Sequence, residues 1–483
     1  MTVRLCLYPL VVFAAGCASI PMPDHPAIGI VPPDHYTSAH VVVTQSVFAD
    51  SVDAHQASWW QELGDTTLSD LVMEGLLHNR DLAAASHRLD AVQAQARMAG
   101  AGRLPQASAG TNANRSRRNF IGFPVAGPAG GGVATSTTTT YDASLLISWE
   151  VDLWGRLRSG HAAALADVEA AQADFAGARL SLAAQVAKLY FRVIEARHQL
   201  DLARATAASQ QSSAQQIEVR YARGLRTSLD LRLARSSAAS AQAQVAARTF
   251  LLDGVTRQLE VLLGRYPAAA LDGAGALPAL ASDVPAGLPA DLIRRRPDLA
   301  AGERRLVASR LRVTEARRAL LPRISLTASG GRSSDALGDL LDGDYSVWNL
   351  VGNLSQPLFQ GGRLRAQVDL ATAGQDAALA QYASTALRAF GEVETALVQQ
   401  ALLADQERLT QMAATEALAA ERLAGDRYAR GLSNYIALLE SQRRAFEAQS
   451  QLLSVRLQRL QARIDLYVAL GGSFESSIPP STL

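Results

Sequence analysis

The sequence is poor in cysteine, in aromatic residues and in unbalanced charge, and each shortage excludes a class of protein. Only Cys6 and Cys17 occur among 483 residues, which excludes a small fold held together by several disulfides. The formal net charge is +1, so nothing indicates a surface that binds nucleic acid or another polyanion. Aromatic residues make up 6%, and the many alanines suit long, closely packed helices better than a thick globular core.

The sequence also lacks converging catalytic or metal-binding groups. Its eight histidines are scattered, at positions 25, 35, 40, 55, 78, 87, 161 and 198, without the spacing of metal ligands, and no nucleophile elbow is found. We therefore expect no enzyme activity, no catalytic residue, no metal and no cofactor.

The only long apolar run is at the N-terminus and has the features of an export signal. It extends over residues 5–15 after Arg4, which is too short for a permanent membrane helix. It ends in Ala14-Ala15-Gly16-Cys17, which resembles the bacterial lipobox, although Leu is usual where Ala14 stands. We predict a lipoprotein signal over residues 1–16 and acylation of Cys17; a plain signal peptide with an incidental cysteine is the alternative.

The residues that follow the signal carry no periodicity. Residues 17–57 are rich in Pro, His and Ser, and we expect them to form an extended tether. Ala18 follows the cysteine where the Asp that retains bacterial lipoproteins at the inner membrane would stand. By the resemblance to lipoproteins, this implies an anchor in outer-membrane lipid.

A duplicated segment organises the rest of the chain. The string Arg-Tyr-Ala-Arg-Gly-Leu occurs at residues 220–225 and again at 427–432, an offset of 207. In each copy the glycine suits the left-handed conformation that ends a helix, and a candidate N-cap follows at once. Asp81-Leu82 and Pro105 also return 217 residues later. We predict two structural repeats, over 58–270 and 271–472, and a C-terminal tail over 473–483.

Each repeat carries a long segment without proline. No proline occurs over 129–266 or over 358–478. Helices over 156–222 and 363–429 would each be about 100 Å long at roughly 1.5 Å per residue. A helix of that length cannot be buried in a globule of this size, so we expect it to pack beside others in an elongated assembly.

Four segments alternate between apolar and polar residues and predict strands. They lie at about 104–114, 141–153, 323–331 and 346–358. In the third, Ile324, Leu326 and Ala328 share one face, and Ser and Thr occupy the other. The residues between paired strands, 116–138 and 331–344, are rich in Gly, Ser, Thr or Asp and are expected to be exposed loops.

The length of these strands indicates a membrane location. About ten residues is what a tilted strand needs to cross a bilayer. Four strands cannot close a barrel, and an open edge in lipid leaves costly unpaired backbone groups. Transmembrane strands would therefore require an oligomer.

Several motifs together make the chain similar to the TolC-like outer-membrane factors, and specifically to the NodT-type outer-membrane lipoproteins of tripartite (RND-type) efflux systems. The matching segments are Cys17, Trp59-Trp60, residues 148–155 (SWEVDLWG), both Arg-Tyr-x-x-Gly tips, Gly287-Leu288-Pro289 and Arg296-Pro297-Asp298-Leu299. The resemblance implies an α+β membrane protein with internal duplication. It implies a homotrimer, in which four strands per protomer give a twelve-stranded barrel above a long periplasmic helical barrel. The tips would meet a periplasmic adaptor (membrane fusion protein) coupled to an inner-membrane transporter.

The same resemblance places a gate after the second tip. An apolar ring falls on Ile436 and an acidic ring on Glu440, with Arg443 one turn further. Glu440 as a threefold ring would favour cations, and a local ion pair with Arg443 is the simpler alternative. Asp230, the acid of the first repeat, is expected to serve a capping box with Thr227.

The tips themselves are assigned to adaptor docking. Arg220 and Arg427 are expected to form salt bridges there, and Tyr221 and Tyr428 are candidates for packing as much as for gating. The docking residues are Arg220, Tyr221, Gly224, Leu225, Arg427, Tyr428, Gly431 and Leu432.

Three functions remain open on these grounds. The first is the channel of a drug-efflux pump that passes small toxic compounds, which lipidation favours. The second is a type I protein-secretion duct, which uses the same architecture. The third, from a different class, is a lipid-anchored coiled-coil scaffold, which would leave four strands with apolar faces unexplained.

Overall fold

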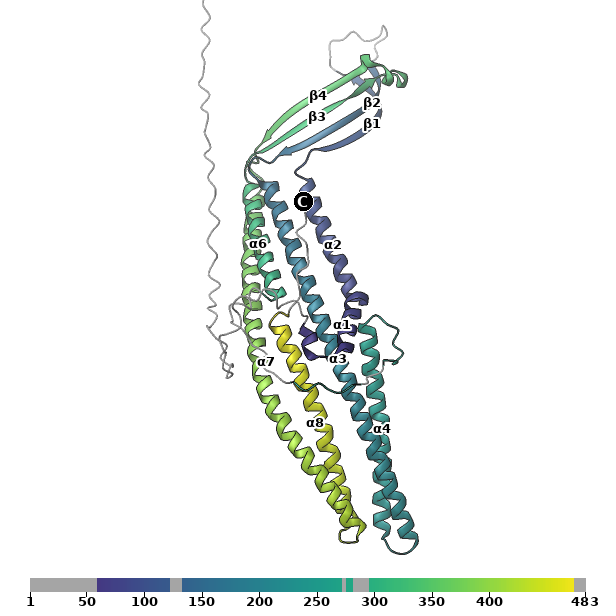
Figure 1. The fold of residues 1–483 in the computed structure, drawn as a ribbon. Coiled ribbons are helices and arrows are strands. Elements are labelled where there is room, and N and C mark those ends of the chain that lie inside the picture. Colours follow the sequence, from purple (N-terminus) through teal and green to yellow (C-terminus); the bar gives the residue numbers. More distant parts are fainter. Residues whose placement is uncertain (1–58, 122–132, 272–274, 281–294, 473–483) are drawn as a thin grey trace, which may run out of the picture.

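The protein is elongated, with a β-sheet at one end and the turns of two helical hairpins at the other (Figure 1). A computed structural model describes residues 59–121, 133–271, 275–280 and 295–472. The predictions for the signal, Cys17, the tether and the C-terminal tail lie outside these residues, as does the motif at residues 287–289. Within the described part, none of the helices is both long and apolar enough to cross a membrane.

Four antiparallel strands form one sheet in the order β1-β2-β3-β4. They are β1 (Gln106–Phe120), β2 (Ala134–Val151), β3 (Arg323–Ser334) and β4 (Ser346–Ser355). The pairing is regular, so that Ala107 lies opposite Ile147, Ile147 opposite Ala328, and Ala328 opposite Leu350. Two short 3₁₀ turns, η3 (Leu337–Leu341) and η4 (Gly343–Tyr345), connect β3 to β4.

The loop predicted over 116–138 is wrong at both ends, and its middle, residues 122–132, lies outside the described residues. β1 continues to Phe120 and β2 begins at Ala134, because each Thr of the tract lies opposite a residue of β1, as Thr137 does with Arg117. The loop over 331–344 also begins later than predicted, since β3 runs to Ser334. β4 ends at Ser355, three residues before the predicted boundary.

One face of the sheet is apolar and exposed. Leu145, Ile147 and Trp149 of β2 share it with Leu326 of β3 and Leu354 of β4, and all of them are exposed in the protomer. From Tyr141 to Val151 this face extends over ten residue steps of β2, about 34 Å along the strand at roughly 3.4 Å per residue. A strand tilted by about 40° would then span about 25 Å, the height of the apolar band of membrane barrels.

Two helices of equal length extend from the sheet. α3 (Arg156–Ala222) and α7 (Arg363–Ala429) each contain 67 residues, which confirms both predicted ranges. Each begins after a glycine with positive φ, Gly155 at 79° and Gly362 at 84°. Each returns as a shorter helix, α4 (Ser228–Leu262) or α8 (Tyr435–Ala469), that packs along it.

The main core lies midway along the helices. η2 (Trp59–Leu63), α1 (Thr66–His78) and α2 (Arg80–Ala101) pack there against α3, and α6 (Pro297–Arg318) packs between α3 and α7. The ring of Trp59 stacks on Tyr467 at a centroid distance of 5.4 Å, and Trp59 and Trp60 are fully buried. The Trp59-Trp60 pair therefore joins the start of the first repeat to the last helix of the second.

Candidate functional site

The two hairpin tips have the same backbone structure. Gly224 and Gly431 adopt φ of 73° and 76°. The N–H of Leu225 donates to the carbonyl of Arg220 at 2.9 Å, and the N–H of Leu432 donates to the carbonyl of Arg427 at 2.8 Å. This is the Schellman helix end, in which only glycine avoids strain at the left-handed position.

The helices that follow the tips are capped by side chains, as the sequence predicted. Thr227 and Asp230 form a capping box at the start of α4, with Asp230 N–H donating to the Thr227 hydroxyl at 3.1 Å. Asn434 accepts from the N–H of Ala437 at 2.9 Å at the start of α8. Asp230 thus has the structural role that the sequence analysis preferred.

The side chains of the two tips are not equivalent. Tyr428 is buried and packs at 5.8 Å from the ring of Tyr435, whereas its counterpart Tyr221 is 42% exposed. The guanidinium groups of Arg220 and Arg226 lie 5.7 Å and 4.8 Å from the centroid of the Tyr428 ring. A cation–π contact thus joins the first tip to the second.

The salt bridges predicted for Arg220 and Arg427 are absent from the described part of the protomer. Arg220 contacts the Tyr428 ring instead, and Arg427 is exposed. Leu225 and Leu432 are 68% and 65% exposed. Each tip therefore presents a leucine and arginines to its surroundings.

The predicted gate residues form a stripe along the exposed side of α8. Ile436, Glu440, Arg443 and Glu447 recur at helical spacing, and Ile436 is 53% exposed. The opposite side of α8 is buried through Tyr435, Leu438, Gln442 and Ala445. In the first repeat, Leu229 and Leu233 stand where Ile436 and Glu440 stand in the second.

Glu440 is held by two arginines of its own helix. Arg443 donates to both carboxylate oxygens, at 3.0 Å and 2.8 Å, and Arg444 donates to Oε1 at 2.7 Å. Arg443 also donates to Glu447 at 2.6 Å. These four side chains carry no net charge together, so the acidic position is locally neutralised.

These ion pairs shift the pKa values of Glu440 and Arg443. Hydrogen bonds from Arg443 and then Arg444 lower the pKa of Glu440 to about 2, and those from Glu440 and Glu447 raise the pKa of Arg443. Glu440 therefore stays ionised throughout the range from neutral to mildly acidic pH.

Sequence reasoning missed Arg226, Arg444 and Tyr435. Arg444 could have been found, because it stands four residues after Glu440 on a helix and can reach it. Arg226 carries no such signal, since it lies 202 residues before Tyr428 in the chain. Tyr435 lies only seven residues after Tyr428, but the turn between them hides the contact from any helical spacing.

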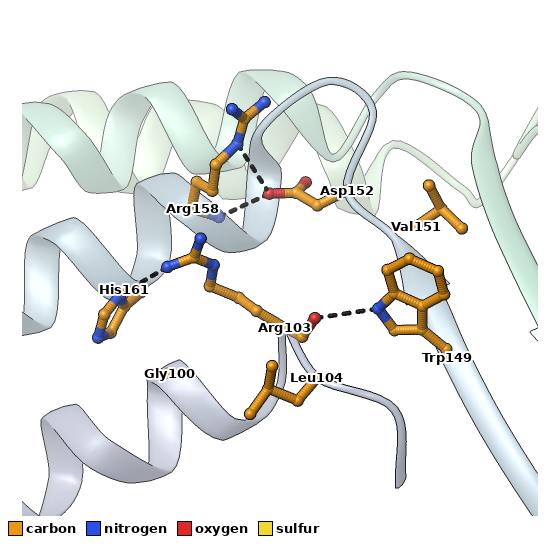
Figure 2. Close-up of a pocket in the computed structure, with 8 residues that line it drawn as sticks. All are labelled: Gly100, Arg103, Leu104, Trp149, Val151, Asp152, Arg158 and His161. Carbon is orange, nitrogen blue, oxygen red and sulfur yellow. Dashed lines mark hydrogen bonds and ion pairs between the residues drawn. The ribbon is translucent and has the colours of Figure 1, made fainter.

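A hollow lies where the sheet meets the helices. It has a volume of about 510 Å³, and Figure 2 shows Arg103, Trp149 and His161 around it. The indole N–H of Trp149 donates to the carbonyl of Arg103 at 3.0 Å, and the Arg103 guanidinium lies 3.2 Å from Nδ1 of His161. Asp152 accepts from the N–H of Arg158 at 2.8 Å and so caps α3. These contacts brace the junction between β2, α2 and α3.

The architecture of a strand pair and a long hairpin, present twice, has a counterpart among known proteins. The outer membrane efflux protein family matches the chain over residues 71–265 and 288–472, one segment for each repeat. The chain belongs to this family.

Known efflux proteins are similar over nearly the whole chain. The pyoverdine export outer membrane protein OpmQ of Pseudomonas putida is 32% identical over 99% of this chain and 98% of its own length. The outer membrane protein OprJ of Pseudomonas aeruginosa is 32% identical over 95% and 94%. The solved structure of the Neisseria gonorrhoeae MtrE outer membrane channel has 29% identity and a TM-score of 0.74, covering 84% of this chain and 89% of its own.

The family settles fold, location and general function. The protein has the TolC-like fold with an internal repeat, lies in the bacterial outer membrane and periplasm, and is the outer-membrane channel component of an efflux system. The family is one of channels, not enzymes. The resemblance inferred from the sequence motifs is thereby confirmed.

Proposed function

We propose that three copies of this chain together form the wall of one channel. This channel carries small organic compounds from a periplasmic adaptor to the exterior. The observation that supports this most strongly is the sheet. It has an exposed apolar face, and the outer edge of each of its two edge strands, β1 and β4, has no strand beside it in the described protomer. Unpaired edges are costly in lipid, and three protomers would pair every edge in a twelve-stranded barrel.

The hairpin tips are the proposed docking surface for the adaptor, which an inner-membrane transporter would accompany. They lie at the end of the helices opposite the sheet (Figure 1), and they expose Leu225 and Leu432 beside arginines. The stripe of Ile436, Glu440 and Arg443 is the proposed gate, because it is the exposed side of the helix that follows the second tip.

Small organic compounds are proposed as cargo because relatives are named for such compounds. One relative is named for the export of pyoverdine, and a toluene efflux pump protein of Pseudomonas putida is 32% identical over 87% of this chain. The exposed stripe on α8 mixes apolar and balanced charged groups, which suits cargo of either charge.

The direct test is to purify the full-length protein from outer membranes and measure its oligomeric state and conductance. A heat-modifiable trimer in detergent and single-channel currents in planar bilayers are expected. A monomer that is silent in bilayers would contradict the channel and favour the scaffold.

The cargo is tested by deleting the gene and measuring both drug sensitivity and the secreted proteins. Increased sensitivity to several small compounds, with unchanged secreted proteins, is expected. Loss of a secreted protein with unchanged drug sensitivity would favour the type I secretion duct.

Acylation of Cys17 is proposed as a second attachment to outer-membrane lipid. The variant Cys17→Ser should lose the lipid label in cells fed a palmitate analogue and still yield inserted trimers, because the barrel alone would hold them. An unacylated protein that never reaches the outer membrane would show that the anchor is essential.

A further inference from the structure

The two edges of the sheet carry opposite charge at the end away from the helices. On the β1 side these are Arg115, Arg117 and Arg118. On the β4 side they are the acidic residues of the β3–β4 connection: Asp335, Asp339, Asp342 and Asp344. In Figure 1 the connection and the far end of β1 lie at the same end of the sheet.

None of these seven residues forms an ion pair in the described protomer. Arg117 donates a hydrogen bond of 3.5 Å to the Thr135 hydroxyl, and Ser334 donates to Asp339 at 3.1 Å. Asp342 accepts from the N–H of Asp344 at 3.2 Å. Three guanidinium groups and four carboxylates therefore lie at one end of the sheet without an ion pair between them in the described protomer.

The register shows why they do not meet within one protomer. Ser346, the first residue of β4, lies opposite Arg332, which in turn lies level with Ala143 and Thr111. Beyond Thr111, β1 continues to Phe120 with only β2 beside it. β1 is an edge strand over its whole length, and its far half, which carries Arg115, Arg117 and Arg118, extends beyond the level of Ser346.

If further copies of the chain close the sheet into a barrel, the arginines of one protomer come close to the aspartates of the next. An antiparallel sheet that closes on itself must place β4 of one protomer beside β1 of the next. The segment Gly343–Tyr345 runs directly into β4, so it enters the barrel beside the far half of a neighbour's β1. The unpaired charges of the two edges are then neighbours of opposite sign.

We propose that Arg117 and Arg118 of each protomer pair with Asp342 and Asp344 of the next, forming an electrostatic clasp around the outer rim of the barrel. The inference rests on the proposed trimer, because the clasp exists only between copies. Each seam carries one such set, so the clasp is repeated three times around the rim. Opposite charges across paired strands stabilise a sheet and like charges destabilise it, so the clasp would also fix the register of the seam.

Charge reversal on each edge tests the clasp in the full-length protein. The variants are Arg117→Glu with Arg118→Glu, Asp342→Arg with Asp344→Arg, and all four changes together. We expect either pair alone to lower the temperature at which the trimer dissociates in SDS by about 5 °C or more, and the fourfold variant to recover most of that loss. High salt should reduce the differences, because it screens exposed charges.

The control is Arg204→Glu, which reverses an exposed arginine on α3 whose ionic partner, Asp201 at 3.7 Å, belongs to its own helix. It should leave the dissociation temperature unchanged. A trimer that survives both edge reversals unaltered would overturn the clasp and leave the trimer standing. Wild-type protein that never forms a trimer would overturn both.

One competing partner is distinguished by the same variants. Arg115 and Arg117 share the apolar face of β1 and could instead contact the phosphate groups of outer-leaflet lipid. In that case the β1 reversal would destabilise the trimer, the β4-side reversal would not, and the fourfold variant would recover nothing. That pattern would overturn the clasp in favour of a lipid contact.

Discussion

Asn79 and Arg296 occupy equivalent places in the two repeats and make the same contact with different chemistry. The Asn79 amide donates to the carbonyl of Leu262 at 2.8 Å, and the Arg296 guanidinium donates to the carbonyl of Ala469 at 3.1 Å. Each accepting carbonyl lies in the last turn of a returning helix, α4 or α8, where no helical partner is available. Each residue thus links the C-terminal end of a hairpin, α4 or α8, to the core helix that begins next to it, α2 or α6.

Substitution of either Asn79 or Arg296 should destabilise the core, and the loss of stability should be larger for Arg296. Arg296 also binds Asp298 at 2.8 Å and Glu392 at 2.6 Å, and it is buried. We expect Arg296→Met to cost about 3 kcal/mol, because it leaves partners of a buried charge unpaired, and Asn79→Ala to cost about 1–2 kcal/mol. Thermal unfolding followed by far-UV circular dichroism would measure both. Equal losses would contradict this ranking.

Two glycines with positive φ should differ sharply in their tolerance of alanine. A Cβ on Gly264 would lie 2.5 Å from the carbonyl oxygen of His78, whereas a Cβ on Gly224 would meet open space. Gly224→Ala should therefore cost only about 1–2 kcal/mol of left-handed strain. Gly264→Ala should lower the yield of folded protein severely, because backbone must move. Comparable yields of folded protein would refute the distinction.

The charge preference of the channel should depend on the balance around Glu440. Glu440→Ala removes the acidic partner of Arg444 and one of the two acidic partners of Arg443, so we expect a shift towards anions in the reversal potential under a salt gradient. Replacing both arginines by Ala should shift the preference towards cations. If neither variant changes the reversal potential or the conductance, this stripe does not line the pore.

The charge of the Glu440 carboxylate at the proposed gate should not change in mild acid. The pKa of Glu440 is lowered to about 2, so its ionised form and its ion pairs persist above that value and are lost only as the pH falls through it. The charge preference of the channel should therefore stay constant between about pH 7 and pH 4, where an ordinary Glu would already be half protonated. In the double variant that lacks Arg443 and Arg444, the change should appear near pH 4 instead. Wild-type preference that drops near pH 4 would show that the ion pairs do not form in the channel.

The second tip should depend on its tyrosine and the first should not. Tyr428→Ala removes a buried ring that contacts Tyr435, Arg220 and Arg226, at a cost of about 3 kcal/mol. The matched change Tyr221→Ala alters an exposed side chain in the same six-residue string. Hydrogen exchange of the tip peptides should accelerate only in the first variant. Equal acceleration of exchange in both variants would mean that the local six-residue sequence, and not tertiary packing, stabilises the tips.

Short-range chemistry made the helices predictable. The ranges 156–222 and 363–429 agree with α3 and α7, because no proline interrupts either segment and a glycine in the left-handed conformation follows each helix end. The strand ends were misplaced for the opposite reason. The Thr tract and the arginines of β1 have the composition of a loop, and only their pairing with each other makes them strands.

The sequence by itself determined the duplication, the helix boundaries, the tip geometry and the family, because each depends on residues within a few positions of one another or on a pattern that repeats. The tertiary structure alone decided that Tyr428 is buried while Tyr221 is exposed, that Arg220 contacts a ring, and that Asn79 and Arg296 share a role. These facts depend on which surfaces meet when the two hairpins pack, and identical local strings receive different neighbours there.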